Sequence, residues 1–468
     1  MCCFAAFERP ICGKARQAKS FPVHRCAMGA GMPTPRPRLS LMRKIFATLL
    51  LLAIPAPGWA QKPAPSASGT ARAVFEAASA KVLQIRVVLK ATDSQAAIGS
   101  GFIVSADGLV VTNYHVISDF ALDPDRYRLE FVRGDSARGP LRLLNFDVVH
   151  DLALLTMDRR APQHSLLYPD ELRLGERVFS MGNPLDLGLT VVEGTYSGLL
   201  ERSLYQKIHF TGAINPGMSG GPALTRDGRV FGVNVSVRRD GQLVSFLVPA
   251  RFVRTLAQAP SLPKAEGRNG YRTVVRDQLM ANQESLMQKL LAGPLSLTRL
   301  ARYSAPDALG PFVRCWGSAD TEPSKPFEAA YHSCSTEDSL FVTESLATGY
   351  IRYRHSLFSG RSLGPLRFYG LYQGHFQSGS MVPYGSKEEF TRFECHDGFV
   401  NHEGKTLRAL LCARAYRRLP GLYDMLMRVA TLDSSTQGLQ SHLTLSGIRH
   451  ENGLRFARKY LEAITWTK

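Results

Sequence analysis

The sequence predicts a mainly β fold for residues 72–258 and a separate, disulfide-containing α+β domain for residues 270–468. Two observations support the first part. Between residues 82 and 248 the apolar residues fall in short runs with strand periodicity, and Asp-Gly turns separate several of these runs. Many short strands joined by glycine turns are typical of antiparallel sandwiches or barrels. The second part rests on a long helical stretch, mixed strands and turns, and an even number of cysteines.

The elements of the β part can be placed in order along the chain. A short helix is expected near 72–80, followed by a strand over Val82–Leu89 whose alternate apolar residues share one face. Asp-Gly pairs at 107–108, 227–228 and 240–241 predict hairpin turns. Further strands are expected at 101–105, 109–113, 127–132, 152–157, 178–181, 191–197 and 242–248, and a closing helix at 251–257.

The C-terminal part begins after a Pro- and Gly-punctuated linker at 259–269. Helices are expected near 271–291 and 454–464. Four cysteines lie in this part and allow three pairings, of which the sequence-local one joins Cys315 to Cys334 and Cys395 to Cys412. Disulfides are expected in preference to free thiols because the chain also carries a pattern for export to an oxidising compartment.

That export pattern covers residues 42–60 and is typical of a signal peptide. It has a basic Met42-Arg43-Lys44, an apolar run at 45–54 that is too short to span a bilayer, and small residues before Gln61. An uncleaved membrane anchor is the alternative interpretation. Residues 1–41 are interpreted as a mis-annotated leader with translation starting at Met42, and 61–71 as a Pro- and Ser-rich linker. A periplasmic or secreted protein is therefore expected.

The charge of the chain does not favour a nucleic-acid-binding protein. The formal net charge is +18, but residues 1–60 carry nine Lys or Arg against a single acid, which leaves +10 for the remaining 408 residues. A modest basic excess of this kind is typical of a solvated surface. We therefore expect no nucleic-acid partner, whereas association with the cell envelope stays open.

One glycine-rich motif suggests a nucleophile. In Gly217-Met218-Ser219-Gly220-Gly221 the glycines allow a tight turn, and that turn can direct the N–H groups of Gly217 and Ser219 at one point as an oxyanion hole. The alternative interpretation is an ordinary Ser/Gly loop.

Two further residues complete a catalytic pattern. His115 lies near the end of the mainly apolar stretch Val110–Val116. Asp151 begins the apolar run DLALL, and a half-buried carboxylate at this position can orient an imidazole. Asp147 is the local competitor of Asp151. The order His, Asp, Ser is the order of the chymotrypsin-type triad, and it would place the base and the aspartate on a first barrel and the serine on a second.

These motifs together resemble the HtrA/Deg branch of the trypsin-like serine proteases over about residues 75–255. The matching stretches are GSGFI at 99–103, TNYHV at 112–116, DLALL at 151–155, GNPLDLG at 182–188, AINPGMSGGPAL at 213–224 and GVNV at 232–235. The resemblance implies a chymotrypsin-like double six-stranded β-barrel, with His115 as general base and acid, Asp151 as its orienting partner and Ser219 as nucleophile. It implies Gly217 as an oxyanion donor beside the Ser219 N–H.

The sequence departs from this family in three places. Met218 stands where the family has Asn, Thr211 stands where an acid is common, and no PDZ domain follows the protease part. Ile214, Asn234 and Ser236 are expected pocket-wall positions. No acid is evident at the base of that pocket, so we expect a small or medium apolar residue before the cleaved bond.

The sequence thus predicts an exported serine endopeptidase that acts on proteins or peptides, by family analogy on unfolded or misfolded envelope proteins. The alternative is a latent or inactive protease scaffold whose C-terminal module binds a partner or the envelope. No cofactor and no metal are expected: the spacings of the C-terminal histidines match no ligand pattern, and turn or surface positions are expected for His332, His355, His375, His396 and His402.

Overall fold

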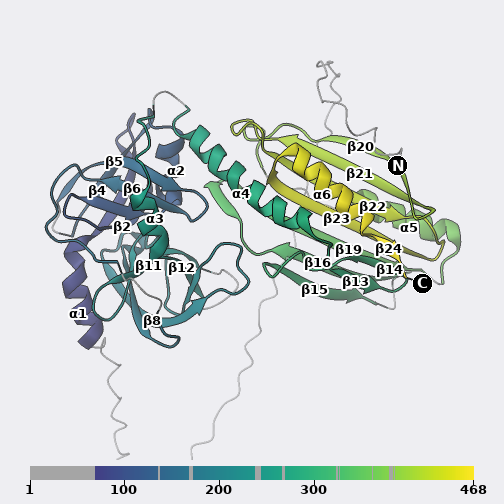
Figure 1. The fold of residues 1–468 in the computed structure, drawn as a ribbon, viewed down its shortest axis with the longest axis horizontal. Coiled ribbons are helices and arrows are strands. Elements are labelled where there is room, and N and C mark those ends of the chain that lie inside the picture. The colour runs from purple at the N-terminus through teal and green to yellow at the C-terminus, as the bar shows by residue number, and fades with distance from the viewer. Residues whose placement is uncertain are drawn as a thin grey trace, which may run out of the picture. The chain divides into compact units, whose positions relative to one another are not determined.

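Two closed six-stranded β-barrels form the N-terminal half of the protein (Figure 1). The structure, a computed structural model, describes residues 69–467 except 135–136, 168–171, 238–243, 266–268, 323–324, 326, 361, 379–382 and 384. The expected signal peptide at 42–60 and the leader before it lie outside the described residues. Within these ranges no helix is both long enough and apolar enough to cross a membrane.

The first barrel has the strand order β1-β2-β3-β6-β5-β4 and follows α1 (Gly69–Ala78) and a short 3-10 turn at Ser79–Lys81. The helix α2 (Tyr114–Leu122) leaves the end of β3. The strands of the first barrel are β1 (Val82–Leu89), β2 (Ser94–Ile103), β3 (Leu109–Thr112), β4 (Tyr127–Val132), β5 (Arg138–Asp147) and β6 (Leu152–Thr156).

The second barrel has the order β10-β11-β12-β9-β8-β7 and ends in the helix α3 (Ala250–Gln258). A 3-10 turn at Pro184–Asp186 lies between its first two strands. The strands are β7 (Arg177–Gly182), β8 (Thr190–Leu199), β9 (Ile208–Phe210), β10 (Pro222–Leu224), β11 (Val230–Val237) and β12 (Ser245–Pro249). The double barrel expected from the sequence is confirmed, although the strands β5 and β9 were not among those expected.

The two barrels pack on each other through a shared hydrophobic core. Phe102 and Leu154 of the first barrel contact Phe179 and Val233 of the second in one buried cluster, which α1 and α3 also join. Burial of this apolar surface fixes the two barrels side by side, so residues carried by different barrels can meet at the junction.

The C-terminal part is built around a seven-stranded antiparallel sheet in the order β15-β16-β19-β23-β22-β21-β20. Around it are α4 (Arg272–Ala292), α5 (Pro365–Ser378), α6 (His450–Glu462) and a three-stranded sheet of β13 (Leu297–Leu300), β14 (Tyr303–Pro306) and β24 (Thr465–Trp466). The strands of the large sheet are β15 (Val313–Asp320), β16 (Glu328–Thr336), β19 (Ile351–Ser359), β20 (Glu394–His402), β21 (Lys405–Ala415), β22 (Tyr423–Thr431) and β23 (Gln437–Ile448).

Helices cover both faces of this sheet. On β19, Tyr353 packs with Phe456 of α6, whereas Phe358 packs with Phe368 of α5. An odd and an even residue of one strand point to opposite faces, so α6 and α5 lie on opposite sides, and α4 runs beside α6 (Figure 1). His355, which we expected in a turn or at the surface, is fully buried on β19, and that expectation was wrong.

Two disulfides fasten the two edges of the sheet. Cys315 pairs directly with Cys334 across β15 and β16, and Cys395 with Cys412 across β20 and β21. Since β15 and β20 are the outermost strands, each disulfide ties an edge strand to its neighbour. The observed pairing is the sequence-local one.

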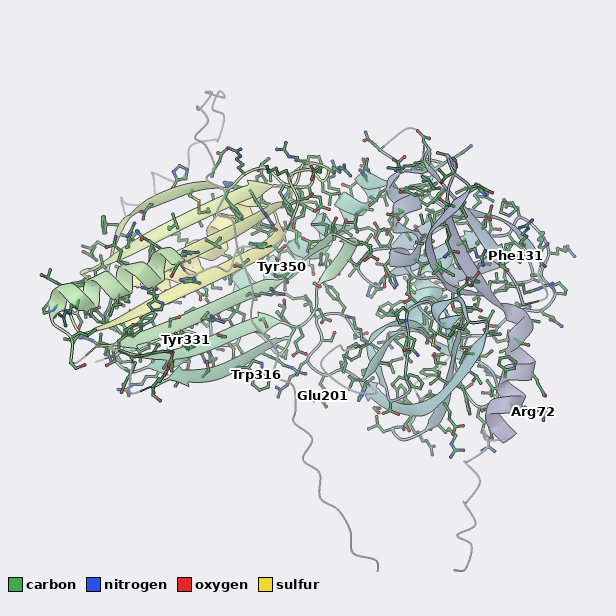
Figure 2. The ribbon with its side chains drawn as sticks, turned by 180° about the vertical axis from the view of Figure 1, so that it is seen from behind. Arg72, Phe131, Glu201, Trp316, Tyr331 and Tyr350 are labelled. Atoms are coloured by element: carbon green, nitrogen blue, oxygen red, sulfur yellow. A yellow bond between two sulfur atoms is a disulfide. The ribbon has the colours of Figure 1, made fainter. Side chains whose placement is uncertain are left out.

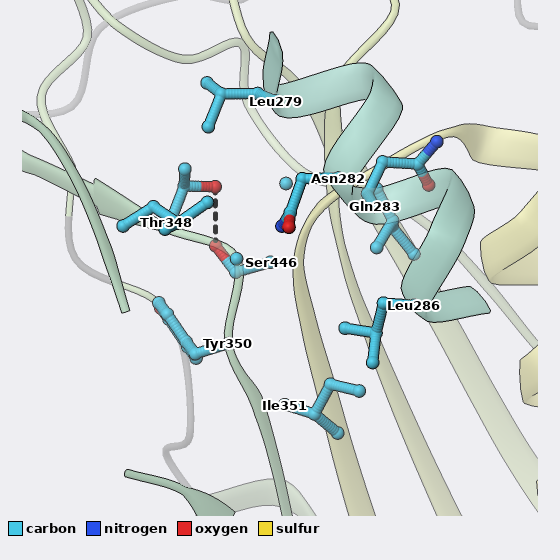
Figure 3. Close-up of a pocket in the computed structure, with 12 residues that line it drawn as sticks. Leu279, Asn282, Gln283, Leu286, Thr348, Tyr350, Ile351 and Ser446 are labelled. Atoms are coloured by element: carbon cyan, nitrogen blue, oxygen red, sulfur yellow. Dashed lines mark hydrogen bonds between the residues drawn. The ribbon is translucent and has the colours of Figure 1, made fainter. Parts of the chain in front are cut away.

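A short hairpin of β17 (Leu340–Thr343) and β18 (Leu346–Thr348) projects from the C-terminal part onto the first barrel. Leu340, Val342 and Leu346 belong to the same buried cluster as residues of that barrel, and β17 contacts α2. Behind the hairpin, a cavity of only 10 Å³ separates β18 from α4 (Figure 3), about the space of one water molecule. The barrels and the C-terminal part belong to one compact unit.

Candidate active site

His115 and Asp151 lie in direct contact at the end of the first barrel. His115 is the second residue of α2, directly after β3, and Asp151 occupies the turn between β5 and β6 with a left-handed φ of 55°. The ring atom Nδ1 of His115 donates to Asp151 Oδ2 over 2.6 Å, and the backbone N–H of His115 donates to Asp151 Oδ1 over 2.8 Å. Two hydrogen bonds to one carboxylate fix the ring and leave Nε2 as the free nitrogen.

The surroundings of His115 adjust its basicity. Burial disfavours the charged imidazolium, but the negative charge and hydrogen bond of Asp151, with a smaller contribution from the charge of Glu344, outweigh burial and raise the pKa of His115 above its usual 6.5. A histidine of this kind is a stronger proton acceptor than a free imidazole, and it is fully available as a base only above its raised pKa.

Asp147 has another partner. Its Oδ2 accepts a hydrogen bond of 2.6 Å from Nδ1 of His150, and its Oδ1 accepts the N–H groups of Val149 and His150. The ring of His150 stacks on Phe252 at 3.8 Å between centroids. The structure therefore brings Asp151, and not Asp147, to His115.

The serine loop consists of two consecutive turns, each with a glycine at its third position. Met218 N–H donates to Asn215 C=O, with Gly217 at φ 92°, and Gly221 N–H donates to Met218 C=O, with Gly220 at φ 84°. Type II turns require a positive φ at this position. A Cβ on Gly220 would also lie 2.2 Å from the carbonyl oxygen of Ser100, so the motif leaves no room for other residues there.

Ser219 is the second residue of the second turn, and its hydroxyl binds a backbone oxygen instead of the histidine. Its Oγ donates to the carbonyl oxygen of Val235 over 3.1 Å, and no hydrogen bond joins it to His115 in the described part of the chain. The backbone N–H groups of Gly217 and Ser219 donate to no described residue. The loop therefore leaves two donors, on either side of Met218, available to a ligand.

Ser100 connects the serine loop to the first barrel, and we did not single it out from the sequence. Its Oγ donates to Gly217 C=O over 2.7 Å and accepts the Asn183 N–H over 2.8 Å, while its own N–H donates to Ser219 C=O over 2.7 Å. Ser100 is fully buried. In the sequence, the available signal was the serine between Gly99 and Gly101. Two backbone segments can approach closely only where the flanking residues are small, and glycines on both sides of Ser100 meet this requirement.

The expected pocket residues have different positions. Asn234 is fully buried, and its amide donates to the carbonyl oxygens of Met181 and Met218, so it supports the serine loop from beneath and does not line a pocket wall. Ile214 is 4% exposed and packs in the core of the second barrel with Met218. Ser236 of β11 pairs with Phe246 of β12, and the side chain of Ser236 lies outside the described part.

A cleft of 1290 Å³ opens beside the His115–Asp151 pair. It includes Val235, whose carbonyl holds the Ser219 hydroxyl, and Glu201, labelled in Figure 2, on its second-barrel side. The C-terminal part contributes to its lining through Arg314, Arg352, Leu340 and Phe341.

One group of side chains has the composition of a metal site. Asp307, Cys315, His332 and Cys334 lie together, but the two cysteines are joined in a disulfide. The thiolates that a metal would need are thereby consumed, and the remaining pair, Asp307 and His332, hydrogen-bond to each other over 2.9 Å.

Comparison with known proteins agrees with this geometry. Residues 99–233 match the family profile of the trypsin-like peptidase domain. The serine protease HTRA1 of Xenopus laevis is 35% identical over 169 residues, which cover 34% of this chain and 35% of that protein. A probable periplasmic serine endoprotease, DegP-like, of Chlamydia pneumoniae is 34% identical over 154 residues, 32% of this chain and 30% of that protein.

The serine endoprotease from Yersinia pestis has a crystal structure that covers 41% of this chain and 65% of its own, with 23% identity and a TM-score of 0.36. The chain spans about a third of the length of the curated relatives it matches, and the match to the family profile lies in its barrel half. Residues 99–233 are therefore similar to the trypsin-like peptidase domain, and the relatives that resemble this chain over about a third of its length include HtrA- and DegP-like serine proteases.

Proposed function

We propose that the protein is a serine endopeptidase in which Ser219 attacks the peptide carbonyl, His115 transfers the proton and Asp151 orients His115. The observation that carries the proposal is the doubly hydrogen-bonded His115–Asp151 pair beside a serine loop with two unoccupied N–H donors. General base, nucleophile and oxyanion donors are the three components that acyl transfer requires.

The reaction begins with a rotation of the Ser219 side chain. Its hydroxyl leaves the carbonyl oxygen of Val235 and donates to Nε2 of His115, which the bond between Nδ1 and Asp151 keeps free to accept a proton. Ser219 Oγ then bonds to the peptide carbon as its proton passes to His115. The N–H groups of Gly217 and Ser219 stabilise the oxyanion of the tetrahedral intermediate.

The second half of the reaction reverses these transfers. His115 gives its proton to the leaving amine, the carbon–nitrogen bond breaks, and an acyl-enzyme on Ser219 remains. Water then loses a proton to His115 as it attacks the ester, and Ser219 regains that proton when the carboxylic acid product leaves.

Unfolded or misfolded proteins of the cell envelope are the substrates that we propose. The name of the Chlamydia relative, which includes the word periplasmic, and the signal-peptide pattern at 42–60 support export of this chain. We further propose a small or medium apolar residue before the cleaved bond, because no acidic residue is evident in the sequence around Ile214 to confer a preference for Arg or Lys.

A latent enzyme is the second candidate, and one observation favours it. The Ser219 hydroxyl is engaged by Val235 and not by His115, as expected for a site that needs an activating event. Hydrolysis of an unfolded polypeptide by the purified protein, absent in Ser219→Ala, would support the active enzyme. Hydrolysis that appears only after a peptide ligand is added would support the latent one, and none under either condition would contradict both.

A further inference from the structure

The hairpin of the C-terminal part presents one aromatic side chain to the catalytic histidine. Along β17, Leu340 and Val342 are buried in the core shared with α2, whereas Phe341 between them is only partly buried and packs against that core. The ring of Phe341 meets the ring of His115 edge-on, with 5.7 Å between centroids. Phe341 is half-buried and lines the cleft beside His115 and Asp151.

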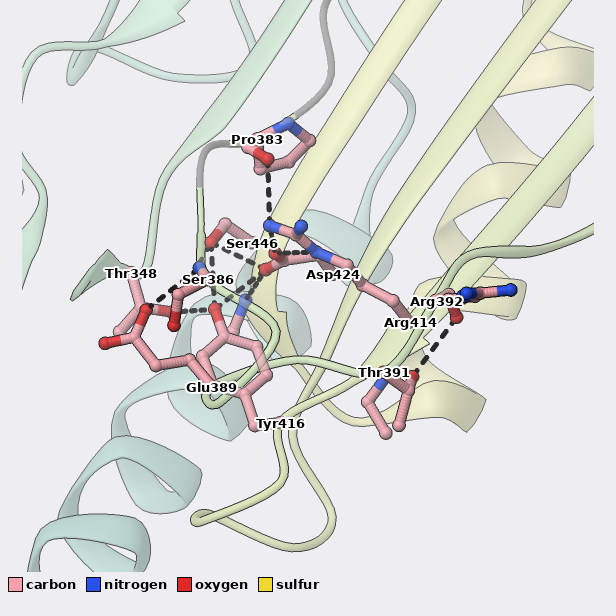
Figure 4. Close-up of polar contacts among 12 residues, drawn as sticks. Thr348, Pro383, Ser386, Glu389, Thr391, Arg392, Arg414, Tyr416, Asp424 and Ser446 are labelled. Carbon is pink, nitrogen blue, oxygen red and sulfur yellow. Dashed lines mark hydrogen bonds and ion pairs between the residues drawn. The ribbon is translucent and has the colours of Figure 1, made fainter. Parts of the chain in front are cut away.

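The hairpin is held firmly in this position. From the barrel side, Tyr114 OH donates to Val342 C=O over 3.4 Å. From behind, Thr348 of β18 hydrogen-bonds to Tyr416 over 2.7 Å, and Tyr416 donates to the buried carboxylate of Asp424 over 2.7 Å (Figure 4). Arg414 completes this network with an ion pair to Asp424 of 2.8 Å. A buried and fully paired network of this kind fixes the side chains that it joins.

Asp338, just before the hairpin, forms hydrogen bonds with a loop of the second barrel that also lines the cleft. Asp338 accepts hydrogen bonds from Ser203 Oγ, the Leu204 N–H and Lys207 Nζ, each of 2.7 to 2.8 Å. These three residues belong to the loop between β8 and β9 of the second barrel. The segment 338–348 therefore contacts both barrels, His115 at one end and the 203–207 loop at the other.

We infer that the C-terminal part forms one wall of the peptide-binding cleft, and that Phe341 contacts the substrate side chain next to the cleaved bond and selects apolar residues there. Two cations of the cleft, Lys207 and Arg314, are paired with Asp338 and Glu337. The partly buried Phe341 is an apolar side chain of the C-terminal part that both lines the cleft and contacts the His115 ring. This inference rests on the proposed endopeptidase function and assigns a specificity-determining residue outside its trypsin-like domain.

The test compares cleavage of a peptide library by the purified protein, by Phe341→Ala and by Phe399→Ala. Phe399 is a matched control because it lies on β20, is 70% exposed and does not line the cleft. For peptides with a medium-sized apolar residue next to the cleaved bond, we expect kcat/KM to fall about tenfold in Phe341→Ala, mainly through KM. Peptides with a small residue there should change less than twofold, and Phe341→Leu should recover part of the loss.

Two results would overturn the inference. An unchanged ranking of peptides in Phe341→Ala would show that Phe341 does not contact the substrate, and a uniform increase in rate would show that the hairpin obstructs the cleft. Labelling of Ser219 by a fluorophosphonate probe separates these results from failure of the proposed function. An unlabelled and inactive wild-type protein would remove the function and the inference together, whereas a labelled Phe341→Ala with unchanged ranking would remove the inference alone.

Discussion

Substitution of Ser100 by alanine tests whether the serine loop depends on its support from the first barrel. The change removes the hydroxyl that donates to Gly217 C=O and accepts the Asn183 N–H, while the backbone hydrogen bond from Ser100 to Ser219 stays possible. Gly217 supplies one of the two proposed oxyanion donors. We therefore expect the variant to fold, with a less well-oriented Gly217.

The expected magnitude follows from the two contacts that are lost. Each buried polar group left without a partner costs about 1–3 kcal/mol, so the free energy of unfolding should fall by about 2–6 kcal/mol. Complete loss of one oxyanion donor lowers kcat about 100- to 1000-fold. Since Ser100→Ala leaves the Gly217 N–H in place and only releases its orientation, we expect kcat to fall by about 10- to 100-fold with a smaller change in KM.

The assay measures kcat and KM for one peptide, together with thermal unfolding, in the wild type, in Ser100→Ala and in Ser441→Ala. Ser441 is a matched control because it is equally buried and hydrogen-bonded, to Tyr460, but lies in the C-terminal sheet. An equal loss of stability in both variants, with kcat at the wild-type value, would contradict the role of Ser100 in orienting Gly217. The pH at which activity rises should be the same in all three, because His115 and Asp151 are untouched.

Further predictions concern the histidine and the disulfides. Asp151→Asn keeps a residue that tolerates the left-handed φ of 55° but removes the charge, and kcat should fall about 10⁴-fold without loss of fold by circular dichroism. Because the general base must be neutral, activity should rise with pH through the raised pKa of His115, and Glu344→Gln should move this rise to lower pH in a pH–rate profile; an unmoved or upward-shifted profile would contradict the role of Glu344. Replacement of Cys315 and Cys334 by alanine removes a disulfide between residues 19 positions apart and should lower the free energy of unfolding by about 3 kcal/mol in a denaturant titration. Unchanged stability would contradict the role of this disulfide in holding the edge strand.

The barrel half was accessible from sequence because its signals are local. The strand at Val82–Leu89 and the hairpin glycines are specified within a few residues, and Asp151 meets His115 because both flank strands of one small barrel. The strand at Arg138–Asp147 was missed because its polar residues and Gly139 and Pro140 obscure the alternation that marks a strand.

The rest depends on contacts between distant parts of the chain. Ser100 lies 117 residues before Gly217, and Phe341 reaches His115 from another part of the fold, so neither role leaves a local pattern. Asn234 was expected in a pocket wall, whereas in the structure it is fully buried and its amide donates to the carbonyl oxygen of Met218 in the serine loop. The order of the C-terminal sheet, with β19 beside β23, needs pairings that periodicity alone does not specify.

Reaction of the purified protein with a fluorophosphonate probe, followed by peptide mapping in a mass spectrometer, tests the central claim most directly. We expect one covalent adduct, on Ser219, that is absent in Ser219→Ala and strongly reduced in a variant with His115 replaced by alanine. An adduct on another residue, or equal labelling with and without His115, would contradict the proposal that His115 activates Ser219.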